Sequence, residues 1–202
     1  GKTLMPKIVD RDEYRRELLK GCFALFSRKG YADVTMREIA RELNVSTGTL
    51  YHYFPTKKDV FEQLFEQESK LDIAAILKEI RPLRDQDEIY RRIAAHWERN
   101  RAFYQNIMLL AVDFYRSNGA LAGQEAIVRF SDTYRKAIAA YLNVTPKAAS
   151  FIFITVIGLM YHSLLAPAGV DFGEQLGLLK TVVDAGSSAG RRRKPSGGRA
   201  SA

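Results

Sequence analysis

The sequence predicts an all-α protein of about nine helices, with a compact N-terminal group of three and a longer helical body after it. Apolar residues recur at spacings of three and four, Pro and Gly fall between these segments, and strand-type alternation hardly appears. The 202 residues, 47% of them hydrophobic and 27% charged, suffice to bury a core.

Capping signals define the first three helices. A helix begins after Asp10 and ends at Gly30. Thr35 opens a short second helix as the first residue of a T-x-x-E capping box, and Asn44 ends that helix in the left-handed conformation. Ser46 caps a third helix of similar length.

Caps and breaks predict six further helices, at about residues 57–80, 86–100, 101–116, 120–142, 147–166 and 171–185. From residue 186 onward the chain is rich in Gly, Ser and Arg and has no apolar periodicity. It is therefore expected to be a flexible basic tail.

Cysteine and histidine usage excludes several classes of protein. The single cysteine, Cys22, rules out an intramolecular disulfide framework and a cysteine-rich zinc site. The three histidines, His52, His96 and His162, include no pair at the i,i+4 spacing of a metal site. We therefore expect no metal and no cofactor. No nucleophile elbow or phosphate loop is present, so an enzyme is not expected, although a small helical hydrolase is a minor alternative.

The formal net charge of +8 is unevenly distributed. Residues 1–60 carry a net charge of +4, residues 61–185 carry −1, and residues 186–202 carry +5. Basic ends favour a polyanion as partner, although ordinary solubilising charge has the same composition. The start of the chain lacks the apolar segment of a secretory signal, so a cytoplasmic location is expected.

The segment 148–166 is the one candidate for a membrane span, because it has no Lys, Arg, Asp or Glu over nineteen residues. Four polar residues interrupt it, and no basic cluster stands close to either end. We therefore prefer a helix buried on both faces in a soluble protein, with no membrane partner.

The stretch TMREIARELNVSTGTLYHYFPTK, residues 35–57, places two short helices around a tight turn. This is the plan of a helix-turn-helix, in which the second helix enters the major groove of DNA with small or polar side chains outward. Val45, Leu50 and Phe54 are spaced to face the core, which leaves Thr47, Thr49 and His52 on the outer side.

Lys57 and Lys58 stand in the first turn of the next helix, where the helix dipole disfavours cations. A DNA phosphate bound there would offset the unfavourable charge. The alternative is that Asp59 neutralises the turn and the two lysines are solvated.

Residues 11–65 resemble the DNA-binding domain of TetR-family transcriptional regulators. The matching positions are Phe26, Gly30, Tyr31, Thr35, Ile39, Ala40, Val45, Ser46, Gly48, Thr49, Leu50, Tyr51, Phe54 and Lys57. Asn44 and Thr47 depart from the usual pattern, since the family commonly has glycine at the first position and often lysine at the second. The base preference of Thr47 therefore cannot be transferred from the family.

The resemblance implies that the recognition helix, residues 46–53, reads the major groove while Thr35, Tyr51 and Lys57 hold phosphates. The expected DNA-binding residues are Thr35, Ser46, Thr47, Gly48, Thr49, Tyr51, His52 and Lys57. It also implies three parts: a helix-turn-helix DNA-binding domain over 1–56, a helical domain for effector binding and dimerisation over 57–186, and the basic tail over 187–202.

Members of this family typically bind a small effector inside the helical body, whose chemistry the sequence does not reveal. The candidate effector-binding residues are His96, Trp97, Tyr104, Met108, Asp113, Tyr134, Phe153 and Tyr161. Aromatic residues at helical spacing are more often core, so a core role is the alternative for each of them. The polar candidates could equally satisfy a neighbouring helix.

Helices 147–166 and 171–185 are expected to form a homodimer, because a helix that is apolar all round needs a partner on its outer face. A dimer would place two recognition helices about 34 Å apart on an inverted repeat in double-stranded DNA. We thus expect a repressor that a small-molecule effector releases from a palindromic operator. The main alternative is a non-specific DNA-binding scaffold that uses the Arg191–Lys194 cluster.

Overall fold

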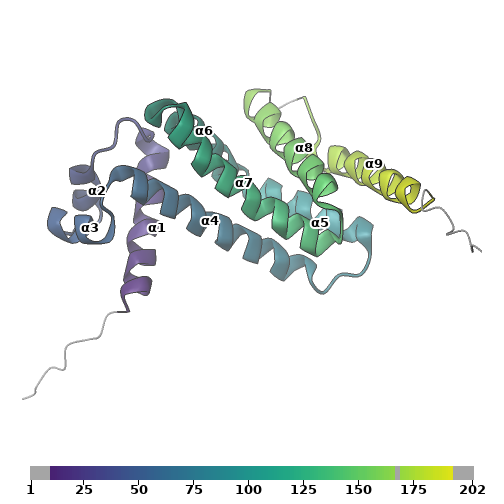
Figure 1. Ribbon diagram of the computed structural model, residues 1–202, viewed down its shortest axis with the longest axis horizontal. Coiled ribbons are helices and arrows are strands. Elements are labelled where there is room, and N and C mark those ends of the chain that lie inside the picture. Colours follow the sequence, from purple (N-terminus) through teal and green to yellow (C-terminus); the bar gives the residue numbers. More distant parts are fainter. Residues whose placement is uncertain (1–9, 167–168, 193–202) are drawn as a thin grey trace, which may run out of the picture. The chain divides into compact units, whose positions relative to one another are not determined.

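The computed structural model describes residues 10–166 and 169–192, and every regular element within these ranges is an α-helix (Figure 1). The helices are α1 (Arg11–Lys29), α2 (Met36–Glu42), α3 (Thr47–Tyr53), α4 (Lys57–Ile80), α5 (Gln86–Arg99), α6 (Arg101–Asn118), α7 (Ala120–Leu142), α8 (Pro146–Leu165) and α9 (Phe172–Arg192). The all-α class and the number of helices predicted from the sequence are thus confirmed for the described chain.

The predicted helix ends are present. The Asp10 side chain accepts hydrogen bonds from two backbone amides of α1, and the Thr35 capping box is complete on α2. Ser46 caps α3. Asn44, between α2 and α3, has a φ of 53°, so it takes the left-handed conformation that the turn requires.

The last helix is longer than the sequence indicated. It continues to Arg192 and includes residues 187–192, which composition assigned to the basic tail. No proline occurs between its start and Pro195, and the Gly and Ser residues of this segment lower helix propensity without preventing a helix. The rest of the expected tail, residues 193–202, lies outside the described residues.

The chain forms two compact units, and each is made of two separate segments. One comprises Gly1–Ala74 with Asn106–Ser131, and the other Ala75–Gln105 with Asp132–Ala202. The first unit therefore contains α1 to α3, most of α4 and α6, and the first half of α7. An aromatic contact explains why α6 belongs there, because the rings of Phe61 on α4 and Phe114 on α6 stack with centroids 4.4 Å apart.

The core of the first unit contains five apolar residues of α1, namely Leu18, Leu19, Cys22, Leu25 and Phe26. Cys22 and Phe26 are fully buried. Burial raises the pKa of the Cys22 thiol to about 12, and its Sγ donates a hydrogen bond to the carbonyl oxygen of Leu18. Cys22 is therefore a core residue.

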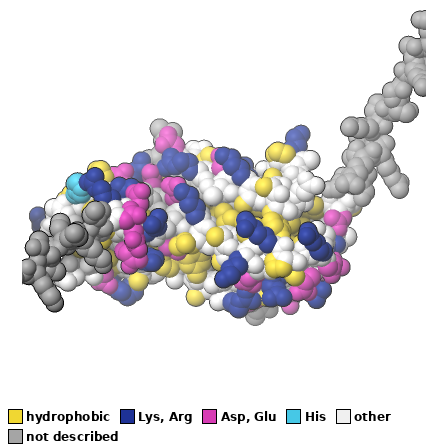
Figure 2. Space-filling model, turned by 90° about the horizontal axis from the view of Figure 1, so that it is seen from below, with side chains coloured by type: hydrophobic (Ala, Val, Ile, Leu, Met, Phe, Trp, Pro, Cys, Tyr) yellow, Lys and Arg dark blue, Asp and Glu magenta, His cyan; other side chains and the backbone are white. Residues whose placement is uncertain are grey.

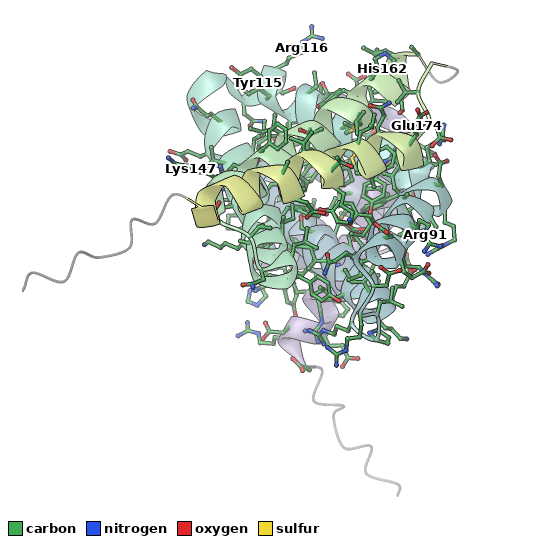
Figure 3. All side chains as sticks on the ribbon, turned by 90° about the vertical axis from the view of Figure 1, so that its right-hand side faces the viewer. Arg91, Tyr115, Arg116, Lys147, His162 and Glu174 are labelled. Carbon is green, nitrogen blue, oxygen red and sulfur yellow. The ribbon has the colours of Figure 1, made fainter. Side chains whose placement is uncertain are left out.

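The second unit is built on the contacts of α9 with α5 and with α8. Its buried cluster comprises Tyr90, Ala94, Trp97, Tyr104, Ile152, Phe172, Leu176, Leu179 and Val183. Figure 3 shows this unit with α9 running across the front of the view, and it labels His162 near the end of α8 and Glu174 near the start of α9.

Helix α8 is not buried on both faces within a single chain, contrary to expectation. Phe151 and Ile154 on it are 48% and 66% exposed. By length and composition alone it could cross a membrane, but core helices of soluble proteins meet the same criterion. The face of α8 that carries these two residues is therefore apolar and exposed in the isolated chain.

Candidate DNA-binding surface

Two large apolar residues anchor one side of helix α3 in the core. Leu50 and Phe54 have no exposed surface, so one side of α3 is fixed in the core of its unit. On the other side Thr47, Tyr51 and His52 are exposed, as is Gly48. The helix therefore presents the small and polar outer face that the sequence predicted.

Two of the hydroxyl groups predicted to bind DNA, those of Ser46 and Thr49, lie at the N-terminal cap of α3. Ser46 Oγ accepts the backbone N–H of Thr49 at 2.9 Å, and the two side-chain hydroxyls lie 2.8 Å apart. Thr49 is half-buried, whereas Thr47 has no such internal bond among those the structure records. Thr47, Gly48, Tyr51 and His52 are thus the residues of α3 most available to a partner.

His52 is bonded to Arg11, a contact that sequence reasoning missed. A guanidinium nitrogen of Arg11 lies 2.6 Å from His52 Nε2. Arginine only donates hydrogen bonds, so Nε2 accepts and the imidazole proton is on Nδ1. Arg11 and His52 are 41 positions apart in the sequence, so no helical or strand periodicity relates them. The contact adds a cation beside the outer face of α3.

Thr35 has a structural role in addition to the predicted phosphate contact. Its hydroxyl donates to Glu38 Oε2 at 3.0 Å and accepts from the Glu38 backbone N–H at 3.2 Å. Bonds from Lys29 and then from Thr35 lower the pKa of Glu38 to about 2. To donate to a phosphate, the Thr35 hydroxyl would have to turn away from Glu38.

The Lys57 ammonium lies against the loop between α1 and α2. Its Nζ donates to the carbonyl oxygens of Tyr31 at 2.8 Å and Ala32 at 3.1 Å, and it sits 4.4 Å from the centre of the Tyr31 ring. Burial lowers the pKa of Lys57, whereas the nearby carboxylates of Asp113, Asp33 and Glu38 act in the opposite direction.

Lysine and arginine side chains appear across the molecular face in Figure 2, interspersed with acidic and hydrophobic ones. The arrangement on that face is mixed rather than a single basic patch. On this face charge does not mark a nucleic-acid surface, whereas the geometry of α3 does indicate one.

The candidate effector-binding residues are distributed over both units. His96, Trp97, Tyr104, Tyr134, Phe153 and Tyr161 lie in the second unit, and Met108 and Asp113 lie in the first. Asp113 accepts the backbone N–H of Ala32 at 2.9 Å, and Met108 is buried.

Within the second unit, several candidates already have partners in the protein. His96 is buried and its Nδ1 lies 2.8 Å from Glu79 Oε1, which Arg99 also binds. The rings of Tyr134 and Phe153 are paired at 6.1 Å. The buried indole nitrogen of Trp97, by contrast, has no hydrogen-bond partner among the described residues. Trp97 therefore offers an unused donor within an apolar cluster.

Comparison with known proteins agrees with this geometry. Residues 18–64 match the family model described as "Bacterial regulatory proteins, tetR family". The HTH-type transcriptional regulator HbdR of Aromatoleum sp. (strain CIB) is 44% identical over 55 residues, which cover 27% of this chain and 23% of HbdR. The negative regulator IcaR of the biofilm operon icaADBC in Staphylococcus aureus is 36% identical over 47 residues, covering 23% of this chain and 25% of IcaR.

Solved structures resemble a much larger part of the chain. Salmonella enterica GusR has a TM-score of 0.65 at 20% identity over 89% of this chain and 100% of its own. The fatty acid degradation regulator FadR of Bacillus halodurans has a TM-score of 0.61 at 16% identity, covering 83% and 96%. At such identities the likeness shows the fold alone.

The described chain thus has the fold of bacterial regulators with an N-terminal helix-turn-helix domain. Over residues 18–64 it is similar to the DNA-binding part of the tetR family of bacterial regulatory proteins, and it spans only about a quarter of the length of the regulators HbdR and IcaR that it matches.

Proposed function

We propose that this protein is a homodimeric transcriptional repressor, which binds a palindromic operator and leaves it when a small-molecule effector binds. The outer face of α3 is the observation that carries the proposal. Thr47, Gly48, Tyr51 and His52 are exposed there, while Leu50 on the opposite side is fully buried. Such a helix can enter a major groove without disturbing its own support.

Helices α8 and α9 are the proposed dimer interface. Both expose large apolar side chains, namely Phe151, Ile154, Leu178 and Val182. Exposed apolar surface of this kind is stabilised by burial against a second copy. A two-fold axis between the copies would also pair the two recognition helices, which accounts for an operator in two inverted halves.

The second unit is the proposed site of effector binding, through Trp97, Tyr104, Tyr134, Phe153 and Tyr161, with His96 as a polar neighbour. Its buried aromatic cluster and the unpaired indole N–H of Trp97 suit a mainly apolar molecule with one hydrogen-bond acceptor. Two solved structures of similar fold hold a ligand, FadR of Bacillus subtilis with stearoyl-CoA and EbrR with imidazole. They support small-molecule binding as a class and do not identify the effector here.

Release from DNA is then a shift between two conformations. An effector that binds better to a conformation with more widely separated recognition helices lowers operator affinity by that difference in binding free energy. Operator and effector therefore weaken each other equally. The site of action would be the bacterial cytoplasm, where the DNA is.

Selection of bound fragments from a random DNA pool at about 150 mM salt, with sequencing of the survivors, tests the proposal. The full chain should enrich one inverted repeat. The double variant Thr47→Ala/His52→Ala should enrich a different or weaker motif, because it alters the outer face of α3. Leu50 and Phe54, which hold the helix in the core, are unchanged in this variant. Binding without any motif, lost steadily as salt rises, would favour the non-specific scaffold instead.

A further inference from the structure

The loop between α1 and α2, residues 30–35, is held on one side by the first residue of α4. Two of the three N–H groups of the Lys57 ammonium point to loop carbonyl oxygens, those of Tyr31 and Ala32. The Tyr31 ring lies beneath the same ammonium at 4.4 Å. The loop therefore fixes the position of the Lys57 ammonium group.

Helix α6 holds the same loop on its other side. Asp113 Oδ2 accepts the backbone N–H of Ala32 at 2.9 Å, and the Tyr31 hydroxyl donates to Asn118 Oδ1 at 3.3 Å. The Phe114 ring meets the Tyr31 ring edge-on, with centroids 5.0 Å apart. The loop, Lys57 and residues 113–118 of α6 all belong to the first compact unit.

A glycine makes the approach of Asp113 possible. Gly30 has a φ of 81°, a conformation that side chains disfavour, and a Cβ built on it would lie 3.0 Å from Asp113 Oδ2. Any other residue at this position would push the carboxylate away from the Ala32 amide. The loop is thus shaped to receive a residue of α6.

We propose that Asp113 is a positioning residue for DNA binding: it holds the loop that aims the third N–H of Lys57 at a DNA phosphate. The inference rests on the proposed function, and it adds a route for regulation. A shift of α6 that moves Asp113 loosens the loop carbonyls, and Lys57 then loses its fixed position. Helix α6 controls a phosphate contact without touching DNA.

A double-mutant cycle on the duplex selected by the wild type tests this coupling. The full-length wild type, Asp113→Ala, Lys57→Ala and the double variant are compared by fluorescence anisotropy between 50 and 300 mM salt. Each single variant should bind about three- to tenfold more weakly and reduce the salt slope by about one. The double variant should bind no more weakly than Lys57→Ala.

Two controls separate positioning from charge and from folding. Asp113→Asn keeps an acceptor oxygen for the Ala32 amide and should retain wild-type affinity. Asp33→Ala removes another carboxylate that acts on Lys57 and should not weaken binding, since loss of negative charge favours DNA. Loss of the negative charge of Asp113 would likewise favour DNA binding. A loss of DNA affinity in Asp113→Ala must therefore come from the loss of its positioning role. If Asp113→Ala does not fold, Asn118→Ala replaces it in the cycle.

Hydrogen exchange of the Ala32 amide, followed by NMR without DNA, provides a second readout. Exchange should be at least about tenfold faster in Asp113→Ala than in the wild type or Asp113→Asn. Unchanged exchange, unchanged DNA affinity of Asp113→Ala, or losses that multiply in the double variant would each overturn the inference. A wild type that selects no DNA motif would instead refute the proposed function itself.

Discussion

The ring of Trp97 on α5 stacks on the ring of Phe172 at the start of α9, with centroids 4.0 Å apart and planes 7° from parallel. Both side chains are almost completely buried. Because Trp97 is the only tryptophan in the chain, its fluorescence reports directly on this contact between α5 and α9.

Removing the Phe172 ring should destabilise the second unit strongly. Phe172→Ala deletes a buried aromatic ring and is expected to lower the free energy of unfolding by about 3 to 5 kcal/mol. Urea unfolding followed by circular dichroism measures the loss, and the emission of Trp97 should shift to longer wavelength. Leu71→Ala removes an exposed apolar side chain and should change stability by less than about 0.5 kcal/mol. Equal effects of the two substitutions would contradict this account of the core.

Ser46 and Thr47 are adjacent, yet their substitutions should have different effects. Ser46→Ala removes the cap of α3 and should lower the stability of the fold by about 1 kcal/mol. Thr47→Ala should leave stability within about 0.5 kcal/mol of the wild type, because its side chain is exposed. In DNA binding, Thr47→Ala should change base preference at one position of each half-site. Thermal unfolding and a panel of single-base operator variants measure the two effects.

Glu38 should make the stability of the folded protein depend on pH in the acidic range. Its pKa is about 2 in the folded protein and 4.5 ordinarily, so its ionised form favours folding. This contribution is complete above the ordinary value and is lost as the pH falls toward 2. The wild type should therefore unfold at a higher temperature than Glu38→Gln at pH 7, and the difference should shrink between about pH 5 and pH 2.

Glutamine is the appropriate replacement because it can still accept hydrogen bonds in the capping box. A difference between wild type and Glu38→Gln that stays constant down to pH 2 would show that charge on Glu38 has no role. A difference that grows on acidification would give the pKa shift the opposite sign.

A charge on the exposed face of α8 should separate the proposed dimer. Ile154 is 66% exposed in the single chain, and Ile154→Glu would bury a carboxylate in an apolar interface. Sedimentation at micromolar concentration should show monomers for this variant and dimers for the wild type. Leu71→Glu is the matched control, since Leu71 is 52% exposed on α4, outside the proposed interface. Dimers of Ile154→Glu as stable as those of the wild type would place the interface elsewhere.

Much of the fold was predictable because local signals determine it. Thr35 and Ser46 are capping residues whose partners are three positions away, and Asn44 takes the one conformation that its turn allows. The outer face of α3 follows from the spacing of Leu50 and Phe54 alone. Helix ends that depend on weak signals, such as the extension of α9 to Arg192, were predicted less well.

Contacts between distant segments were not predictable. Asp113 and Ala32 are 81 positions apart, and Arg11 and His52 are 41 apart, so no periodicity relates them. Asp113 was expected among the effector-binding residues because it is a carboxylate in apolar surroundings, and its place beside the α1–α2 loop depends on the tertiary packing of α6. The rings of Phe61 and Phe114, which stack within the first compact unit, likewise come from segments that no periodicity relates.

The affinity ratio between an inverted-repeat duplex recovered by selection and a scrambled duplex of equal length tests the central claim most directly. Measured for the wild type at about 150 mM salt, this ratio should reach about 1,000 or more, as for specific regulators. A ratio near one, with both affinities falling together as salt rises, would contradict sequence-specific recognition by α3.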